Sequence, residues 1–547
     1  MAPDLRPCHD YHFKIPISIY REKGNHIANI LRHIPFVIFT DINRQKYTKR
    51  FFLGRRIQNK LYDTLADNFA LRANRTAVTK KKMICKSQSS LKIEQLKYHP
   101  TASLEWFSPL SAMPWAMILR SAANNHPDNR FDILVADPLA TLETQGEITR
   151  IKLSEGDEKT STDDPFELVA SLQASLLPSV NTMTDIPFLG GALGFFGYDL
   201  GRRVEKLPST SIQDLTTPDM AVGIYDWALI ADHQRQELFL VSPKNSNRLA
   251  WLTELKNSAQ LNHEKHGLQH ADEFALTSEW SANMTFASYC KKFNQVQEYL
   301  TSGDCYQINL AQRFSASYNG NEWAAYCKLD ATNGAPFSGF IRTNESCILS
   351  VSPERFLQHK QGYIQTKPIK GTRPRFTKQQ QDQASAEALR CAEKDRSENL
   401  MIVDLLRNDI GRVAKAGTVK VPSLFAIESF PAVHHLVSTV TGELDNPYSP
   451  SDLLRACFPG GSITGAPKVR AMEIIEELEP NRRNMYCGSI GYISQCGNMD
   501  TSITIRTLVA EHDKMYAWAG GGIVADSEVN SEYQETLDKL SKILPVL

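Results

Sequence analysis

Short apolar runs bounded by turn-forming residues recur from Leu91 to the C-terminus, and they constrain the fold more than any other feature of the sequence. Five runs have the length of a strand, namely 131–136, 221–230, 238–241, 347–351 and 515–519. Three segments have helical periodicity, namely 384–406, 469–478 and 527–544, the last with Ser527 as its expected N-cap and Pro545 past its end. The interspersed patterns predict an α+β fold. No run approaches the roughly 18 apolar residues of a membrane span, so we expect no membrane segment.

Charge is distributed unevenly along the chain. Residues 1–93 contain 19 Lys and Arg against 6 Asp and Glu, whereas the whole chain of 547 residues has 61 of each kind. Such a basic segment either binds nucleic acid or another anionic surface, or is an extension without a role in the chemistry. It carries neither regular alternation of basic and aromatic residues nor a nucleic-acid-binding motif. We therefore favour the second interpretation and do not expect nucleic acid as a partner.

Breaks in the pattern suggest how the chain is divided. The polar stretch 262–273 is the clearest candidate boundary in the patterned region. We expect a basic extension of unknown role over 1–93, an N-terminal lobe over 94–262 and a C-terminal domain over 280–547. The ten cysteines are thinly spread, without a C-x-x-C pair or zinc-ligand spacing. This favours a reducing compartment, and we expect the protein to be cytoplasmic.

Two pairs of carboxylates fall on two of the predicted helices. Glu532 and Glu535 are three residues apart, with Lys539 further along the same face, and Asp395 and Glu398 repeat the spacing. Each pair on its own is typical of a solvated, salt-bridged face. Together, the pairs would suit Mg²⁺, which takes one or two protein carboxylates and keeps several waters. The sequence alone does not establish that the two helices face each other.

Glycine-rich segments and cations suggest a site for a small anionic molecule. The turn-rich loop 459–468 leads into a helix start, which offers free backbone N–H groups to an anion. Gly520 and Gly522 follow a strand and would let the backbone approach a ligand closely. With Arg506 and Lys539, these segments favour a ligand that carries carboxylates.

Lys370 lies in a segment bounded by proline and glycine, 368–375. An ordinary lysine with a pKa of about 10.4 is almost entirely protonated at neutral pH. A nucleophilic role would need burial or a cationic neighbour, such as Arg373 or Arg375, to lower that pKa. Most lysines are merely solvated, and the residues alone do not decide between the two interpretations.

Several motifs carry a resemblance to a known family. They are 303–310, 352–356, 368–372, 398–404, 407–412, 459–468 and 520–535, with 126–138 and 190–199 in the N-terminal lobe. The chain resembles, from about Gln95 onwards, the chorismate-utilising enzymes, which include anthranilate synthase component I, aminodeoxychorismate synthase component I, and the isochorismate and salicylate synthases. The resemblance implies a two-lobed fold like that of anthranilate synthase component I, with packed antiparallel sheets flanked by helices. The segment 280–547 would be the chorismate-binding catalytic domain.

Two positions separate the branches of this family. At Lys370 the anthranilate enzymes carry alanine, whereas in the aminodeoxychorismate synthases a lysine is thought to attack chorismate. At Gln307 the water-using isochorismate and salicylate enzymes carry a lysine that activates water. The pattern resembles the aminodeoxychorismate synthase branch, which implies conversion of chorismate and ammonia to 4-amino-4-deoxychorismate for 4-aminobenzoate and folate synthesis. The alternative is anthranilate synthase component I.

The resemblance also implies roles for single residues. Lys370 would be the nucleophile and Glu354 the catalytic acid. Glu398 and Glu535 would bind Mg²⁺, with Asp395 and Glu532 holding metal-bound water. The implied substrate-binding residues are Gln307, Thr372, His435, Thr464, Tyr486, Arg506, Gly520, Gly522 and Lys539.

Two further ligands are implied by the resemblance. The chain has no recognisable glutaminase segment with a cysteine nucleophile, so ammonia would come from a separate glutamine amidotransferase subunit, component II. Members of these branches also carry a tryptophan pocket. The matching positions are Ser121, Asp128, Asn129, Arg130, Phe131, Pro336, Phe337 and Ser338.

Overall fold

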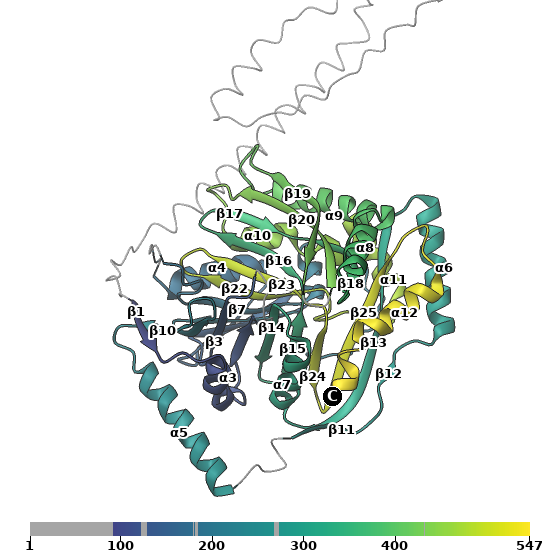
Figure 1. Ribbon diagram of the computed structural model, residues 1–547. Coiled ribbons are helices and arrows are strands. Elements are labelled where there is room, and N and C mark those ends of the chain that lie inside the picture. Colours follow the sequence, from purple (N-terminus) through teal and green to yellow (C-terminus); the bar gives the residue numbers. More distant parts are fainter. Residues whose placement is uncertain (1–90, 122–127, 179, 181–183, 267–272, 431–432) are drawn as a thin grey trace, which may run out of the picture. The chain divides into compact units, whose positions relative to one another are not determined.

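The computed structural model describes residues 91–547 except 122–127, 179, 181–183, 267–272 and 431–432 (Figure 1). Two large antiparallel sheets lie at its centre, with helices against their faces. The predicted α+β class with packed antiparallel sheets is confirmed. Residues 1–90, nearly all of the predicted basic extension, lie outside the described residues, so the role of that extension stays a prediction.

The first sheet contains thirteen strands. They are β1 (Leu91–Leu96), β2 (Met117–Arg120), β3 (Phe131–Val135), β9 (Ala228–Asp232), β10 (Glu237–Pro243), β11 (Phe274–Leu276), β12 (Ser281–Ala282), β13 (Gln307–Gly320), β14 (Phe337–Arg342), β15 (Ser346–Ser352), β21 (Gly465–Ala466), β24 (Thr507–Glu511) and β25 (Lys514–Ile523). Their order is β1-β10-β9-β3-β2-β14-β15-β24-β25-β13-β11, and β12 and β21 also pair with β13.

The second sheet contains twelve strands. They are β4 (Ala140–Gln145), β5 (Ile148–Leu153), β6 (Glu158–Ser161), β7 (Gly191–Phe196), β8 (Met220–Tyr225), β16 (Arg355–Lys360), β17 (Tyr363–Thr366), β18 (Ile369–Pro374), β19 (Lys420–Ser429), β20 (Val433–Glu443), β22 (Ser489–Ser494) and β23 (Met499–Ile503). Their order is β18-β20-β17-β16-β23-β22-β7-β8-β4-β5-β6, and β19 pairs with β20.

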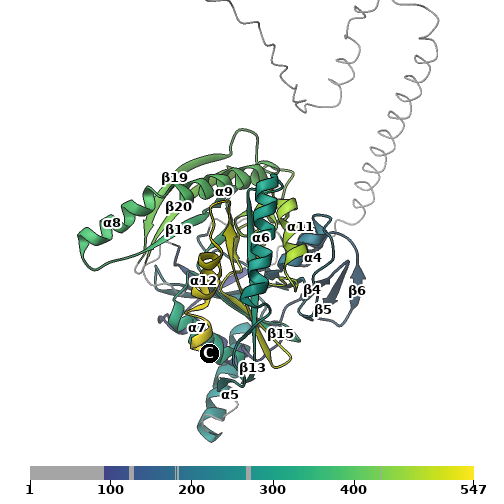
Figure 2. The same ribbon diagram turned by 90° about the vertical axis from the view of Figure 1, so that its right-hand side faces the viewer.

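Ten α-helices are described beside these sheets. They are α3 (Ala102–Phe107), α4 (Pro165–Leu176), α5 (Arg248–His266), α6 (Phe286–Ser302), α7 (Glu322–Asn333), α8 (Gln379–Arg390), α9 (Glu393–Gly411), α10 (Pro450–Cys457), α11 (Lys468–Leu478) and α12 (Val529–Leu540). Helices α8 and α9 pack on β18 and β20, while α6, α11 and α12 lie along β13 and β25 (Figures 1 and 2). No described helix is long and apolar enough to cross a membrane.

Strand alternation explains how the first sheet buries both faces. On β2, Met117 belongs to the core between the sheets, whereas its neighbour Ile118 belongs to the core beneath the outer helices. Successive side chains of a strand point to opposite faces, so apolar residues at consecutive positions indicate a strand that is covered on both sides.

Both sheets combine strands from the two predicted lobes. Strand β2 pairs with β14 in the first sheet, and β7 pairs with β22 in the second. Strand β1 begins at Leu91, so the first described strand begins two residues before the predicted limit at residue 93. The segments 94–262 and 280–547 are therefore successive along the chain but share their sheets.

Three predicted elements differ from the structure. The run 221–230 is two strands, β8 and β9, because the chain turns between them. The segment 384–406 is two helices, α8 and α9, because Ala392 between them has an extended backbone. Helix α12 begins at Val529, and Ser527 does not cap it because its hydroxyl donates to Glu532 Oε1 at 2.6 Å. Periodicity detects helical stretches but not the single residues at which they break or begin.

A buried charged cluster ties β2 and β3 to α3. Asp132 is fully buried, and its carboxylate accepts hydrogen bonds from Ser103 Oγ and Ser121 N. Arg120 Nε lies 3.2 Å and His233 Nε2 lies 3.0 Å from Asp132 Oδ2. Burial alone would raise the pKa of Asp132, but the hydrogen bond from His233 and the charge of Arg120 hold this pKa below its usual range. The resulting stabilisation is present above the pKa of an unfolded aspartate and is lost as the pH falls below it.

Removing this charge should therefore cost stability. For Asp132→Asn we expect the free energy of unfolding at pH 7 to fall by about 3–5 kcal/mol, because Arg120 and His233 lose their buried counter-charge. Chemical denaturation measures the loss. The matched control is Asp137→Asn, since Asp137 pairs with Arg248 while 55% of its side chain is exposed. Such exposed pairs contribute about 0–1 kcal/mol, so equal losses in the two variants would contradict this role of the cluster.

Candidate active site

One cavity of about 880 Å³ gathers most of the predicted functional residues. It is bounded by β18, β20 and the start of α9 on one side and by β25 and α12 on the other. Figure 2 shows α12 next to α9 and β18. The predicted residues that line it are Glu354, Lys370, Thr372, Asp395, Glu398, His435, Tyr486, Arg506, Gly520, Gly522, Glu532, Glu535 and Lys539.

Lys370 projects into this cavity from β18, where the pairing with β20 is irregular. Its Nζ donates to the carbonyl of Ser462 at 3.3 Å and lies 4.0 Å from Glu398 Oε2. The next residue, Gly371, has φ +81°, and a Cβ there would lie 2.8 Å from Asp395 Cγ. Only glycine combines this backbone conformation with such close packing. The strand is thereby bent so that the amine stands beside the carboxylates of α9.

Glu354 lies at the junction of β15 and β16 and is 8% exposed. Its backbone N–H donates to Ser352 Oγ at 3.3 Å, and its carbonyl accepts from Ile503 N at 3.0 Å, so both ends of the residue are fixed. Burial raises the pKa of Glu354 to about 7, although the positive charge of Lys370 opposes the shift. A substantial fraction of this carboxyl group is therefore protonated near neutral pH.

The two predicted carboxylate pairs do meet in the cavity. Asp395 and Glu398 come from α9, and Glu532 and Glu535 come from α12. Burial raises the pKa of Glu398, and the charges of Lys370 and Lys394 oppose this shift. Glu532 is 3% exposed, so the interpretation of this helix face as solvated is wrong for that residue. Glu535 is 47% exposed and pairs with Lys539 at 2.7 Å, as a solvated, salt-bridged face would.

These carboxylates match the donor chemistry of a hard cation. Among the described residues, no three His, Cys, Asp or Glu side chains stand close enough together to enclose a metal ion. Mg²⁺, however, takes only one or two carboxylates and keeps several waters. Within the described part of the chain, Glu532 Oε2 is buried without a hydrogen-bond partner, and a cation or its water would satisfy it. The residues present therefore fit Mg²⁺.

Cationic and polar groups line the cavity beside the carboxylates, and Lys539 Nζ lies 2.7 Å from Glu535 Oε1 on the same helix. Lys539 Nζ donates to the carbonyl of Gly520 at 2.8 Å. Burial lowers the pKa of Arg506, although the charge of Glu354 opposes the shift. Across the β18–β20 ladder, Thr372 Oγ1 and His435 Nδ1 lie 2.9 Å apart. These groups can bind carboxylates and hydroxyls of a small molecule.

Two predicted substrate contacts, Gln307 and Thr464, lie behind the cavity wall. Thr464 is fully buried, and its hydroxyl donates to the carbonyl of Gly460 at 3.1 Å, which holds the glycine-rich loop together. Gln307 is 2% exposed and its amide lies directly beneath Gly522, where a Cβ would overlap it. Both residues shape the wall and do not form its inner surface.

The lining residues that sequence reasoning missed include Asn309, Lys394, Ser462 and Trp518. The sequence could have predicted Asn309, because it lies two positions after Gln307 on the same strand and therefore on the same face. Lys394 and Ser462 gave no distinct signal, since both depend on how α9 and the 459–468 loop pack.

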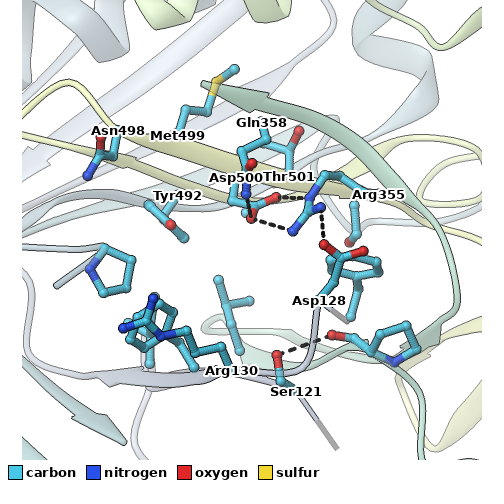
Figure 3. Close-up of a pocket in the computed structure, with 18 of the residues that line it drawn as sticks. Ser121, Asp128, Arg130, Arg355, Gln358, Tyr492, Asn498, Met499, Asp500 and Thr501 are labelled. Carbon is cyan, nitrogen blue, oxygen red and sulfur yellow. Dashed lines mark hydrogen bonds and ion pairs between the residues drawn. The ribbon is translucent and has the colours of Figure 1, made fainter. Parts of the chain in front are cut away.

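A second pocket of about 320 Å³ lies at the predicted tryptophan position (Figure 3). The predicted residues that line it are Ser121, Asp128, Arg130, Phe131, Pro336, Phe337 and Ser338. Asn129 is not among its lining residues. The buried guanidinium of Arg355 donates to Asp128 at 2.6 Å and to Asp500 at 2.9 Å, and it lies over the ring of Phe337. The pocket thus joins paired charges to an aromatic wall.

Comparison with known proteins identifies the family. The chorismate binding enzyme family matches residues 103–545. The chain is a chorismate binding enzyme. Aminodeoxychorismate synthase component 1 of Escherichia coli K12 is 57% identical to it over 455 residues, which cover 83% of this chain and 97% of that relative. The protein of the same name from Klebsiella aerogenes is 58% identical over 451 residues. That alignment covers 82% of this chain and 97% of the relative.

Solved structures agree with this assignment. Anthranilate synthase component I from Streptococcus pneumoniae TIGR4 aligns with a TM-score of 0.66 and 30% identity, over 77% of this enzyme and 93% of that chain. The menaquinone-specific isochorismate synthase of Escherichia coli aligns with a TM-score of 0.60 at 15% identity, over 87% of this enzyme and 98% of that chain. At 15% identity, the likeness to the isochorismate synthase shows a shared fold and nothing about the reaction.

Proposed function

We propose that this enzyme converts chorismate and ammonia to 4-amino-4-deoxychorismate, a precursor of 4-aminobenzoate and folate. The observation that carries the proposal is the 57% identity to aminodeoxychorismate synthase component 1 over almost the whole of that relative. The position of Lys370 beside the acidic wall of the cavity supports it. Anthranilate synthase component 1 of Acetivibrio thermocellus, at 33% identity, represents the less similar alternative.

The proposed reaction has two displacement steps. The neutral amine of Lys370 forms a bond to ring C2, both conjugated double bonds of the ring shift by one position, and the C4–O bond breaks. Glu354, whose burial favours the protonated form, donates its proton so that the hydroxyl leaves as water. Ammonia then forms a bond to C4, the two double bonds shift back, and the C2–N bond to Lys370 breaks. The ammonium formed at C4 gives up one proton, which restores Glu354. Dividing a difficult displacement in this way is the general advantage of a covalent intermediate.

The proposal also assigns a role to the carboxylates of α9 and α12 in the cavity. Glu398 and Glu535 would hold Mg²⁺ directly, with Asp395 and Glu532 holding its waters. The ion would neutralise the ring carboxylate of chorismate. Arg506 and Lys539 would bind the remaining anionic oxygens.

We also propose that ammonia reaches this enzyme from a glutamine amidotransferase subunit, component II. The printed names of the relatives, "component 1", support a partner of this kind. Free ammonium should support turnover without that subunit. A cytoplasmic location remains part of the proposal.

Pyruvate release distinguishes the proposed reaction from its alternative. Formation of 4-amino-4-deoxychorismate retains the enolpyruvyl group, whereas anthranilate formation releases one pyruvate for each chorismate. We expect the purified enzyme, supplied with Mg²⁺ and ammonium, to consume chorismate without pyruvate in a lactate dehydrogenase-coupled assay. Pyruvate released in equal amount to chorismate consumed would support the anthranilate synthase alternative.

We further propose that tryptophan binds in the second pocket. Its 320 Å³ volume suits one amino acid with a large aromatic side chain. Phe131 and Tyr492 supply aromatic surface, while Arg130 and Asp500 offer opposite charges to a carboxylate and an ammonium group.

Added L-tryptophan should stabilise the enzyme. At about 100 times its dissociation constant, a ligand that binds only the folded state raises the free energy of unfolding by about 2.7 kcal/mol. We expect thermal melting to show this rise with L-tryptophan and none with D-tryptophan, which presents its charged groups with the wrong handedness. Protein freed of bound small molecules by dialysis serves as the reference. The absence of both stabilisation and calorimetric binding would contradict the proposal.

A further inference from the structure

Two amide side chains of β13 lie against the glycines of β25. In the antiparallel ladder, Asn309 is paired with Gly522 and Ala311 with Gly520. A Cβ on Gly520 would lie 2.6 Å from Asn309 Oδ1, and one on Gly522 would overlap the amide of Gln307. Positions 520 and 522 of β25 must therefore be glycine because these amide side chains occupy the space of a Cβ, and not only because a ligand approaches the backbone there.

The amide oxygens are buried acceptors without donors. Asn309 is 9% exposed and Gln307 is 2% exposed. Within the described residues, neither Asn309 Oδ1 nor Gln307 Oε1 has a hydrogen-bond partner. Nearly all buried polar atoms in folded proteins are hydrogen-bonded, so an unpaired acceptor calls for an explanation. Gln312 Oε1 on the same strand is likewise unpaired among the described residues, but it belongs to a residue that does not line the cavity. Of Asn309 and Gln307, Asn309 lines the cavity itself.

Asn309 is held rigidly next to the loop that contacts Lys370. Its backbone N–H donates to the carbonyl of Thr464 at 2.9 Å, and its carbonyl accepts from Arg483 Nη2 at 2.6 Å. Arg483 is 1% exposed and also donates to the carbonyl of Ile463 at 3.1 Å. The adjacent residue, Ser462, carries the carbonyl that accepts from Lys370 Nζ. One buried arginine thus connects the strand of Asn309 to the loop beside the proposed nucleophile.

The chemistry of the acceptor restricts its ligand. The carboxylates of chorismate have no N–H or O–H to donate, so they cannot satisfy an amide oxygen. In the proposed reaction the donors are the C4 hydroxyl, which leaves, and ammonia, which enters with three N–H groups.

We propose that Asn309 is a further substrate-contacting residue. Its amide oxygen accepts a hydrogen bond from the incoming ammonia, and this orients the nitrogen lone pair of ammonia toward C4. This assignment rests on the proposed function and deepens it. The step is the second displacement described above: the C4–N bond forms, the C2–N bond to Lys370 breaks, and the departing electron pair returns to the lysine amine. Asn309 forms no covalent bond and its protonation does not change.

Kinetics with free ammonium test this role. For Asn309→Leu, which keeps a similar volume but removes the acceptor, we expect the KM for ammonia to rise about tenfold or more, the effect of one lost hydrogen bond in a desolvated site. The KM for chorismate should change less than threefold. Asn309→Asp, which retains an acceptor oxygen, should recover part of the loss. The same KM for ammonia in Asn309→Leu and in the wild type would overturn the proposal, as would a loss confined to the KM for chorismate.

Two measurements keep the result interpretable. Gln312→Leu is the matched control, because Gln312 is a buried amide on β13 that does not line the cavity and donates to Thr536 Oγ1 at 2.6 Å. Its KM for ammonia should equal that of the wild type.

If Asn309→Leu does not fold, Asn309→Ser replaces it, because the shorter serine side chain holds its acceptor oxygen too far from the ligand. The KM for ammonia of Asn309→Ser must then rise as expected for Asn309→Leu. Wild type that forms no 4-amino-4-deoxychorismate would overturn the proposed function, and this assignment with it, whereas normal product with an unchanged KM in the variants would overturn this assignment alone.

Discussion

Lys370→Ala should reduce the rate of 4-amino-4-deoxychorismate formation roughly 1,000-fold, because it removes the nucleophile of the first displacement. Lys370→Arg should lose activity to a similar extent. Arginine keeps a positive charge near Glu398 but offers no neutral amine at any accessible pH. Comparing the two variants therefore separates nucleophilic attack from simple charge neutralisation. The rates are measured by chromatography of the product at saturating chorismate and ammonium.

Lys367 provides the matched control for these variants. It precedes β18, does not line the cavity, and pairs with Glu428 at 2.8 Å. Lys367→Ala should retain activity within about twofold, since the pair is partly exposed and contributes little. Retention of most activity in Lys370→Arg would contradict the covalent mechanism and leave Lys370 with an electrostatic role.

Glu354→Gln should lower the rate about 100- to 10,000-fold, because the leaving hydroxyl loses its proton donor. In the wild type the pKa of Glu354 is raised by burial to about 7, so the fraction of enzyme able to donate this proton falls as the pH rises through that value. The pH profile of the first displacement should therefore change slope there. Glutamine has no proton to lose, and this change of slope should disappear in the variant. The measurement is formation of the Lys370 adduct without ammonia, which avoids the titration of ammonia itself.

The same variant should be more stable at high pH. Burial raises the pKa of Glu354 from 4.5 to about 7, so the folded state holds the proton more tightly than the unfolded state. Its contribution to stability is complete below the unfolded pKa and is lost as the pH rises through the folded pKa. At pH 8 we expect Glu354→Gln to exceed the wild type by about 2–3 kcal/mol in the free energy of unfolding, and by little at pH 4. A difference that does not depend on pH would contradict the buried, ionisable assignment.

The sequence predicted the strands better than their arrangement. Apolar runs such as 347–351 and 515–519 lie within β15 and β25, because alternation and length are local properties. The pairing of β2 with β14 joins residues more than 200 positions apart, and no local pattern contains that information. The same limitation explains why the predicted lobes share their sheets.

The active site shows the same division between local and long-range information. Motif resemblance placed Lys370 and Glu354 in one site, and the structure brings them into one cavity. Periodicity put Glu532 on a solvated face because it takes no account of what packs against a helix. In the structure Glu532 is buried beside Gly521 of β25 and Lys394 of α9. The contact of Asn309 with Gly520 depends on strand register, which residue types alone do not specify.

Product identity tests the central claim most directly. The purified enzyme is incubated with chorismate, Mg²⁺ and ¹⁵N-ammonium at mildly alkaline pH, and the product is analysed by mass spectrometry. We predict 4-amino-4-deoxychorismate that carries one ¹⁵N and retains the enolpyruvyl group. Labelled anthranilate accompanied by free pyruvate would contradict the account, because Lys370 would then not direct the incoming nitrogen to C4.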